Sequence, residues 1–140
     1  MIKSYCKINL FLRVLKKLKN GLHNIQSNTV LLELHDEIQI KRSLKKKDEI
    51  VFKGKFSPHI NKNENSITKT MFLLRKNRLI NNEKKFKIII TKKIPVYSGL
   101  GGGTSNAAFI IRYFLKNKLN EKYLSIFEKK IGSDLRLFFF

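Results

Sequence analysis

The order of strand-like and helix-like segments predicts a mixed α+β domain. Four strand-like segments come first, followed by a helix-like segment, an isoleucine-rich strand, a glycine-rich loop and two further helix-like segments. That order is typical of a mixed domain in which the loop lies at a strand–helix junction. The 140 residues are enough for one domain with a real core, and the sequence has neither an internal repeat nor an evident linker.

The first part of the chain is predicted to form strands. Tyr5 to Val14 alternates apolar and polar side chains in part, which predicts a strand. Asn20-Gly21 lies in a polar turn and is a strong hairpin signal. Three more strands are expected, over Gln26 to Leu34, Glu37 to Lys41 and Glu49 to Lys53. His35-Asp36 is interpreted as a break between the first two of them.

The remaining elements are three helices and one strand. Asn65 to Leu79 follows a loop that contains Pro58; its apolar spacing is helical, and Asn65 or Ser66 can cap it. Phe86 to Thr91 is expected to be a strand. The last predicted elements are a helix over Thr104 to Leu119, a helix from its cap Asn120 through Lys130, and a short apolar run over Asp134 to Phe140.

The strongly basic composition raises the question of whether the protein binds nucleic acid. The net charge of +20, from 30 Lys and Arg against 10 Asp and Glu, would by itself predict nucleic-acid binding. The lysines are spread along the whole chain, however, and Lys, Asn, Ile and Phe all have A- and T-rich codons. We therefore attribute the charge to a mutational bias, which the base composition of the gene would test.

The sequence favours a cytoplasmic protein. It has no run of about 18 apolar residues, so no membrane span is expected. The N-terminus has a lysine where a signal peptide would be apolar, and no cleavage site follows. The single cysteine, Cys6, cannot form an internal disulfide, which fits a reducing compartment.

The most informative segment is Pro95 to Ala108. Four of the chain's seven glycines fall within positions 99–103, after a strand-like run and before a helix-like run. Glycine lets the backbone bend sharply and turn its N–H groups toward a ligand. The following helix adds unpaired N–H groups and the positive end of its dipole. Such a loop suits a polyphosphate.

Two known glycine motifs do not fit this loop. A Walker A loop needs Lys after its last glycine, where Thr104 stands. A dinucleotide fingerprint needs a third glycine at Thr104 and an acidic residue about 20 positions later. The sequence therefore predicts a phosphate loop of a third kind. The alternative is a flexible turn with Thr104 or Ser105 as the helix N-cap.

Phosphoryl transfer also needs charge stabilisation and a proton acceptor. Lys7 lies inside an apolar strand, Asp134 follows a predicted helix end, and His23 lies in the hairpin turn. Each has a simpler interpretation. Lys7 would point outward on an edge strand, Asp134 would be an ordinary turn residue, and His23 would be a surface histidine.

Taken together, the motifs resemble the GHMP kinase superfamily. The segments that carry the resemblance follow the family's order and spacing over nearly the whole chain: Lys7 to Leu12, Asn20 to His23, Asn65 to Ile67, Pro95 to Ala108 and Gly132 to Asp134. Within the superfamily, the chain is similar to the kinases of 4-diphosphocytidyl-2-C-methyl-D-erythritol in non-mevalonate isoprenoid synthesis. The resemblance implies that residues 1–140 are the N-terminal ATP-binding lobe, a ribosomal protein S5 domain 2-like fold, with the active site between two lobes.

The resemblance also implies site roles. Lys7 would stabilise charge around the reacting hydroxyl, and Asp134 would be its general base. Asn9 would bind the substrate's polyol and His23 its cytosine, while Asn65 would lie near adenine. Mg²⁺ would bridge the phosphates, with Thr104 or Ser105 nearby. The ATP phosphates would be wrapped by Pro95, Val96, Tyr97, Ser98, Gly99, Leu100, Gly101, Gly102, Gly103, Thr104 and Ser105. The reaction would phosphorylate the substrate's 2-hydroxyl and release ADP.

The sequence departs from the family pattern in several places. Leu22 stands where the family usually has an aromatic residue, Tyr97 and Ser98 where it usually has glycine or alanine, and Arg136 where it usually has proline. A bulky Tyr97 is expected to restrict the bend into the loop.

The sequence also stops early relative to the family, whose members continue into a second lobe. A terminal run of phenylalanine, ending at Phe140, is what a frameshift-prone T-rich tract encodes. We therefore expect a truncated product of a decaying gene, with exposed apolar surface and with its solubility and activity in question. The nucleotide sequence after Phe140 would test this.

The sequence leaves two alternative functions. The first is a GHMP kinase for homoserine, mevalonate or a sugar; the Lys7 to Leu10 motif and His23 argue against it. The second is a basic RNA- or ribosome-associated protein. Against the second, no basic–aromatic stripe is present, and the glycine loop and Asp134 would have no purpose. The expected partner is a small-molecule substrate, without a specific nucleic acid or a membrane.

Overall fold

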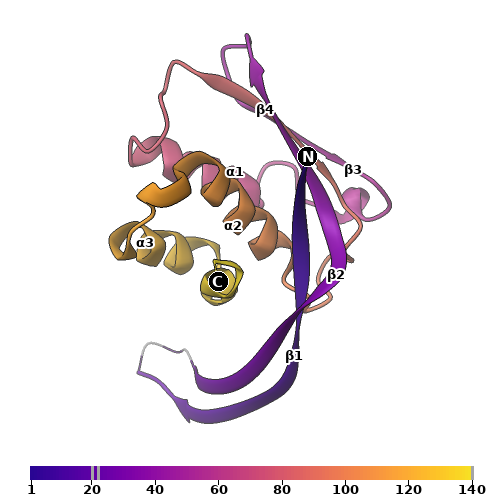
Figure 1. Ribbon diagram of the computed structural model, residues 1–140, viewed down its shortest axis with the longest axis vertical. Helices are drawn as coiled ribbons and strands as arrows, with labels where there is room; N and C mark the ends of the chain where they lie inside the picture. The colour runs from indigo at the N-terminus through magenta and orange to yellow at the C-terminus, as the bar shows by residue number, and fades with distance from the viewer. Residues whose placement is uncertain (20, 22, 140) are drawn as a thin grey trace.

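The computed structural model describes residues 1–19, 21 and 23–139. Over these residues one four-stranded sheet carries helices on one of its faces (Figure 1), which confirms the α+β prediction. In the order in which they pair, the strands are β1 (Ile2–Lys17), β2 (His23–Ser43), β4 (Lys85–Thr91) and β3 (Glu49–Lys53). The helices are α1 (Ser66–Lys76), α2 (Gly102–Leu115) and α3 (Glu121–Ile131).

Strands β1 and β2 form a long antiparallel hairpin, as the turn signal predicts. Their pairing runs from Ile2 opposite Ile38 to Lys17 opposite His23. Two residues of the predicted turn, Asn20 and Leu22, lie outside the described residues.

The prediction of separate strands on either side of His35-Asp36 is wrong. β2 is continuous, and the expected break is a bulge: the pairing shifts between Tyr5–His35 and Cys6–Leu32. A bulge absorbs the extra residues of one strand and bends it without ending the ladder.

The second half of the sheet is a β–α–β unit. β3 pairs parallel to β4, with Ile50 opposite Ile88, and α1 lies in the connection between them. β4 in turn pairs antiparallel with β2, with Ile38 opposite Ile90. The isoleucines that confer strand propensity on β4 therefore also supply the core, because Ile88 and Ile90 are fully buried.

Side-chain caps explain where α1 and α3 begin. The Asn65 carboxamide oxygen accepts from the backbone N–H groups of Ile67 and Thr68, both at 3.0 Å, and the Thr68 hydroxyl accepts from the Asn65 N–H. This capping box decides for Asn65 over Ser66. α1 ends at Lys76, short of the predicted Leu79. At the start of α3, Asn120 accepts from the Tyr123 N–H at 3.1 Å, as predicted.

The start of α2 differs from the prediction. The helix begins at Gly102, and its N-cap is Gly101 in the left-handed conformation, without a side-chain cap. The alternative of a Thr104 or Ser105 cap is therefore wrong. α2 ends at Leu115, earlier than the predicted Leu119, and continues as a 3-10 turn over Lys116–Lys118.

The apolar run near the C-terminus folds as a 3-10 helix over Ser133–Phe138. Leu135 and Phe138 from this turn are buried in the same core as the sheet and α1 to α3. Phe140 lies outside the described residues. The turn carries Asp134 in its first residues and packs against α2.

The core lies between the sheet and the helices, whereas the far half of the hairpin extends away from them (Figure 1). Large apolar side chains of that half are exposed, among them Leu10, Phe11, Leu12, Val14 and Leu15. No helix within the described residues has the length and apolar character needed to cross a membrane.

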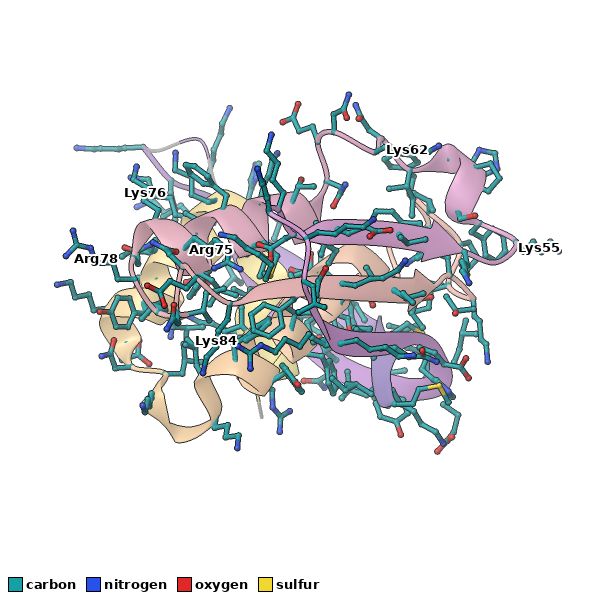
Figure 2. The ribbon with its side chains drawn as sticks, turned by 90° about the horizontal axis from the view of Figure 1, so that it is seen from above. Lys55, Lys62, Arg75, Lys76, Arg78 and Lys84 are labelled. Carbon is teal, nitrogen blue, oxygen red and sulfur yellow. The ribbon has the colours of Figure 1, made fainter. Side chains whose placement is uncertain are left out.

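The basic side chains are distributed over different elements. Figure 2 shows Lys55 and Arg78 at opposite ends of the molecule. Arg75 between them serves the fold, because its guanidinium binds both carboxylate oxygens of Asp48, at 2.6 and 2.7 Å. This distribution agrees with charge that is spread along the sequence.

Candidate active site

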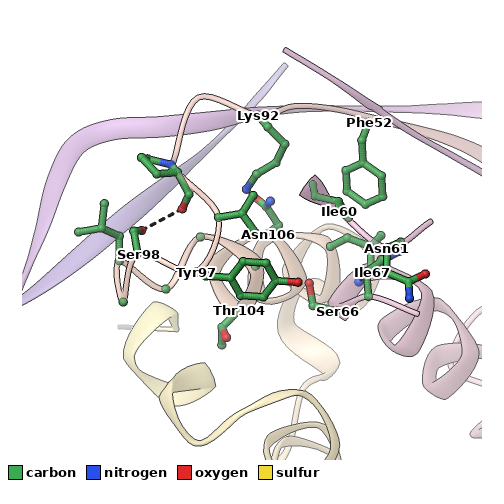
Figure 3. Close-up of a pocket in the computed structure, with 18 of the residues that line it drawn as sticks. Phe52, Ile60, Asn61, Ser66, Ile67, Lys92, Tyr97, Ser98, Thr104 and Asn106 are labelled. Carbon is green, nitrogen blue, oxygen red and sulfur yellow. Dashed lines mark hydrogen bonds between the residues drawn. The ribbon is translucent and has the colours of Figure 1, made fainter. Parts of the chain in front are cut away.

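The glycine loop between β4 and α2 forms one wall of a cavity of about 380 Å³ (Figure 3). That volume lies within the range of small-molecule sites. Most of the predicted loop lines the cavity, from Pro95 to Thr104, and Asn65 lines it from the start of α1. The other lining residues were not predicted: Phe52, Ile60, Asn61, Glu64, Ser66, Ile67, Lys92 and Asn106.

The backbone of the loop has the form that binds anions. Tyr97, Gly99 and Gly101 have φ values of 61°, 75° and 71°, and they alternate with residues whose φ is not positive. Such alternation turns successive N–H groups toward one side, as in anion-binding nests. The N-terminus of α2, which begins directly after Gly101, adds its own unpaired donors.

Close packing at Gly101 and Gly102 leaves little room for a side chain. A Cβ atom on Gly101 would lie 3.0 Å from Phe138 Cζ and 3.2 Å from Lys7 Cγ, and one on Gly102 would lie 3.0 Å from Ile94 Cγ2. The loop therefore rests directly on Lys7 and on the C-terminal turn. A simple N-cap would not require this contact.

Tyr97 adopts the left-handed backbone conformation that suits glycine. The expected restriction of the bend is not observed, because the chain bends at this residue with a φ of 61°. For a large side chain that conformation costs about 1–2 kcal/mol. The ring gains little packing in return, since it is 90% exposed.

Lys7 and Asp134 meet beneath the loop. The Lys7 ammonium lies 3.1 Å from an Asp134 carboxylate oxygen, and the Lys7 side chain is 6% exposed against 39% for Asp134. The Lys7 backbone N–H donates to the Leu100 carbonyl at 2.9 Å, which ties β1 to the loop. β1 is an edge strand, but Lys7 points inward, so the outward alternative is wrong.

The two predicted substrate-binding residues lie at different places. Asn9 is beside the ion pair: its side-chain oxygen accepts from the Lys7 ammonium at 3.3 Å and from the Thr29 hydroxyl at 3.0 Å. His23 pairs with Lys17 at the far end of the hairpin. At about 3.3 Å per residue, the ten residues from Lys7 to Lys17 span up to ~33 Å. The structure does not bring His23 to Lys7.

Two predicted nucleotide-binding side chains are already engaged by the fold. The Asn65 amide also donates to the Asn61 carbonyl at 2.9 Å, so its polar atoms serve the cap. The Ser105 hydroxyl is buried, 2.7 Å from the Ser4 hydroxyl and donating to the Tyr5 carbonyl at 2.6 Å. Ser105 therefore ties α2 to β1 and does not line the cavity.

Thr104 is the loop hydroxyl that fits a metal-bound polyphosphate. Thr104 lines the cavity. A Cβ atom added to Gly132 would lie 3.3 Å from the Thr104 Oγ1, so this hydroxyl lies beside the turn that carries Asp134. Residues 1–19, 21 and 23–139 contain no cluster of three or more His, Cys, Asp or Glu side chains suited to a metal.

Asp36 is a buried hub that sequence reasoning missed. Its carboxylate accepts from the Lys92 ammonium, the Lys93 and Ile94 N–H groups at 2.7 and 2.9 Å, and the Asn106 amide at 2.9 Å. It thereby connects β2, the chain entering the loop, and α2. The available signal is a carboxylate between two apolar strand segments, a pattern that a strand break and a buried ion pair share.

Arg136, where the family usually has proline, joins the C-terminal turn to α3. Its guanidinium donates to Glu128 at 2.9 Å and to Glu121 at 3.0 Å. Its hydrogen bond to Glu128, and to a smaller extent the one to Glu121, raise the pKa of Arg136. The departure thus has a structural role in holding the turn that carries Asp134.

The family model for the GHMP kinases N terminal domain matches residues 65–134, from the α1 cap to the residue paired with Lys7. The chain belongs to the GHMP kinase family. Among solved structures, a crystal structure of 4-(cytidine 5'-diphospho)-2C-methyl-D-erythritol kinase superposes with a TM-score of 0.70 at 22% identity, over 99% of this chain and 48% of that one. The shared GHMP kinase fold is therefore confirmed.

Two curated relatives of this GHMP kinase chain carry the same enzyme name. The 4-diphosphocytidyl-2-C-methyl-D-erythritol kinase of Pelagibacter ubique (strain HTCC1062) is 44% identical over 142 residues, which cover 97% of this chain and 48% of the relative. The chloroplastic enzyme of that name from Mentha piperita is 36% identical over 97% of this chain and 34% of its own length. The chain spans about half the length or less of the curated relatives it matches.

Proposed function

We propose that the chain binds ATP through the glycine loop and directs its γ-phosphoryl group to an alcohol held at Lys7 and Asp134. The observation that carries this proposal is the 3.1 Å contact between Lys7 and Asp134 directly beneath the loop. Phosphoryl transfer depends on positioning and on charge stabilisation, so a loop for the phosphates beside an ammonium and a carboxylate is a suitable arrangement.

The roles follow from the groups present. Backbone N–H groups of residues 97–103 would hold the phosphates, and the N-terminus of α2 would stabilise their charge. The half-exposed Asp134 carboxylate can accept the proton of an entering hydroxyl, while Lys7 holds that carboxylate and stabilises the developing alkoxide. Mg²⁺ bound with ATP would neutralise phosphate charge, and Thr104 is the side chain that would lie near it.

We infer from the names of the relatives that the acceptor is 4-diphosphocytidyl-2-C-methyl-D-erythritol. That the group phosphorylated is its 2-hydroxyl stays a prediction from the family resemblance. Asn9, next to the Lys7 ammonium, is positioned to bind the polyol near the reacting hydroxyl. We propose residues 1–140 as the nucleotide-binding domain of this activity. A cytoplasmic location stays a prediction, since two plant relatives carry a chloroplastic name.

The test is ADP production by the 140-residue chain with ATP, Mg²⁺ and 4-diphosphocytidyl-2-C-methyl-D-erythritol, with homoserine as the competing acceptor. Asp134→Asn should lower turnover at least about 100-fold, because general-base catalysis contributes roughly 10²–10⁴. Lys7→Met should lower it comparably, whereas the charge-matched Lys76→Met, on the exposed face of α1, should not. Undiminished turnover by Asp134→Asn, or a preference for homoserine, would contradict the proposal.

A further inference from the structure

Tyr97 is a cavity-lining residue whose large side chain has no role in the proposed function, although its backbone belongs to the phosphate-binding loop. Its backbone is in the left-handed region at a φ of 61°, and its side chain is 90% exposed. Strained backbone of this kind is concentrated at ligand clamps and active sites, where the strain serves a function. The other left-handed residues of the loop, Gly99 and Gly101, adopt this conformation without a side chain.

The position of the ring suggests what it contacts. In Figure 3 the Tyr97 ring lies between the glycine loop and the start of α1, and its hydroxyl points toward Ser66. The same cavity is lined by the apolar side chains of Phe52, Ile60 and Ile67. The cavity thus has a polar part at the glycines, where phosphates would bind, and an apolar part lined by these three side chains.

We propose that Tyr97 stacks on the purine base of the bound nucleoside triphosphate and so makes the base a determinant of affinity. The inference rests on the proposed function, since it assumes that the loop holds the phosphates. A base has an apolar face that needs a flat partner, and an exposed aromatic ring at the cavity rim offers one.

The experiment compares ATP with inorganic tripolyphosphate, which has the phosphates but no base. Affinities are measured by calorimetry for the 140-residue chain and for two variants. Tyr97→Asn removes the ring, and asparagine tolerates the left-handed conformation. Tyr97→Phe keeps the ring. We expect Tyr97→Asn to weaken ATP binding about tenfold and to leave tripolyphosphate binding unchanged, because stacking on one base is worth roughly that factor. Tyr97→Phe should bind both ligands like the parent chain.

A second readout is tyrosine emission. The chain has four tyrosines and no tryptophan. If a purine stacks on Tyr97, ATP should quench part of the emission and tripolyphosphate should not. The quenching should disappear in Tyr97→Phe and persist in Tyr113→Phe, because Tyr113 lies on α2 outside the cavity.

The possible failures can be told apart. If Tyr97→Asn leaves ATP affinity unchanged, or weakens ATP and tripolyphosphate equally, the stacking proposal is wrong while the phosphate loop stands. If the parent chain binds neither ligand, the proposed function fails and the stacking proposal fails with it.

Discussion

Replacing Asp36 by asparagine should destabilise this protein more than removing its ionic partner Lys92. Both side chains are buried, Asp36 completely and Lys92 to 4% exposure. The carboxylate accepts four hydrogen bonds, whereas the Lys92 ammonium donates one among the residues that the structure describes. Replacing Lys92 therefore removes one of four hydrogen bonds to Asp36, whereas replacing Asp36 removes the one described partner of the Lys92 ammonium.

The magnitudes follow from this asymmetry. In Asp36→Asn the ammonium stays buried without a counter-charge, and the new amide group opposes the Lys92 and Asn106 donors. Breaking a buried pair in this way costs about 3–5 kcal/mol. In Lys92→Met the carboxylate keeps three N–H donors, so the loss should be nearer one charged hydrogen bond, about 1.5–3 kcal/mol. For a domain with roughly 5–15 kcal/mol of total stability, Asp36→Asn is close to unfolding.

Urea unfolding followed by far-UV circular dichroism measures both values, and the double variant completes the cycle. Asp36→Asn with Lys92→Met should be less destabilised than the sum of the single variants by more than about 1 kcal/mol, because the unpaired ammonium is gone. If Lys92→Met costs as much as Asp36→Asn, or if the two losses add, the hub interpretation is incorrect.

Three further outcomes are expected. Asn65→Ala should lower the free energy of unfolding by about 1–2 kcal/mol and Asn120→Ala by less, because Asn65 completes a capping box and Asn120 makes one capping bond; equal losses in urea would contradict this. Tyr97→Asn should raise the free energy of unfolding by about 0.5–1 kcal/mol, since it relieves a left-handed conformation without losing packing; a lower midpoint in urea would argue against strain. Burial raises the pKa of Cys6 above its ordinary 9.0, so its contribution to stability is present below about pH 9 and lost as pH rises through the folded-state pKa. The native thiol should accordingly resist a disulfide reagent such as DTNB until urea unfolds the chain, and rapid native labelling would show that Cys6 is accessible.

Several features were predictable because their causes lie within a few residues of sequence. The Asn65 and Asn120 caps each bind N–H groups two or three residues away, so residue type and spacing are sufficient. The same holds for the β1–β2 hairpin. The glycine loop was predictable too, because clustered glycines at a strand–helix junction already favour an anion-binding backbone.

Local sequence therefore predicts most of the elements, some of their limits and the segment suited to phosphate. The tertiary contacts are needed to see that Lys7 points inward toward Asp134, that Asp36 lies within one continuous strand and binds the Lys92 ammonium, that Ser105 faces β1, and that His23 lies far from Lys7. The physical reason is that these outcomes depend on burial and on partners distant in sequence. A carboxylate between strands has the same local pattern whether it ends a strand or binds a lysine across the fold.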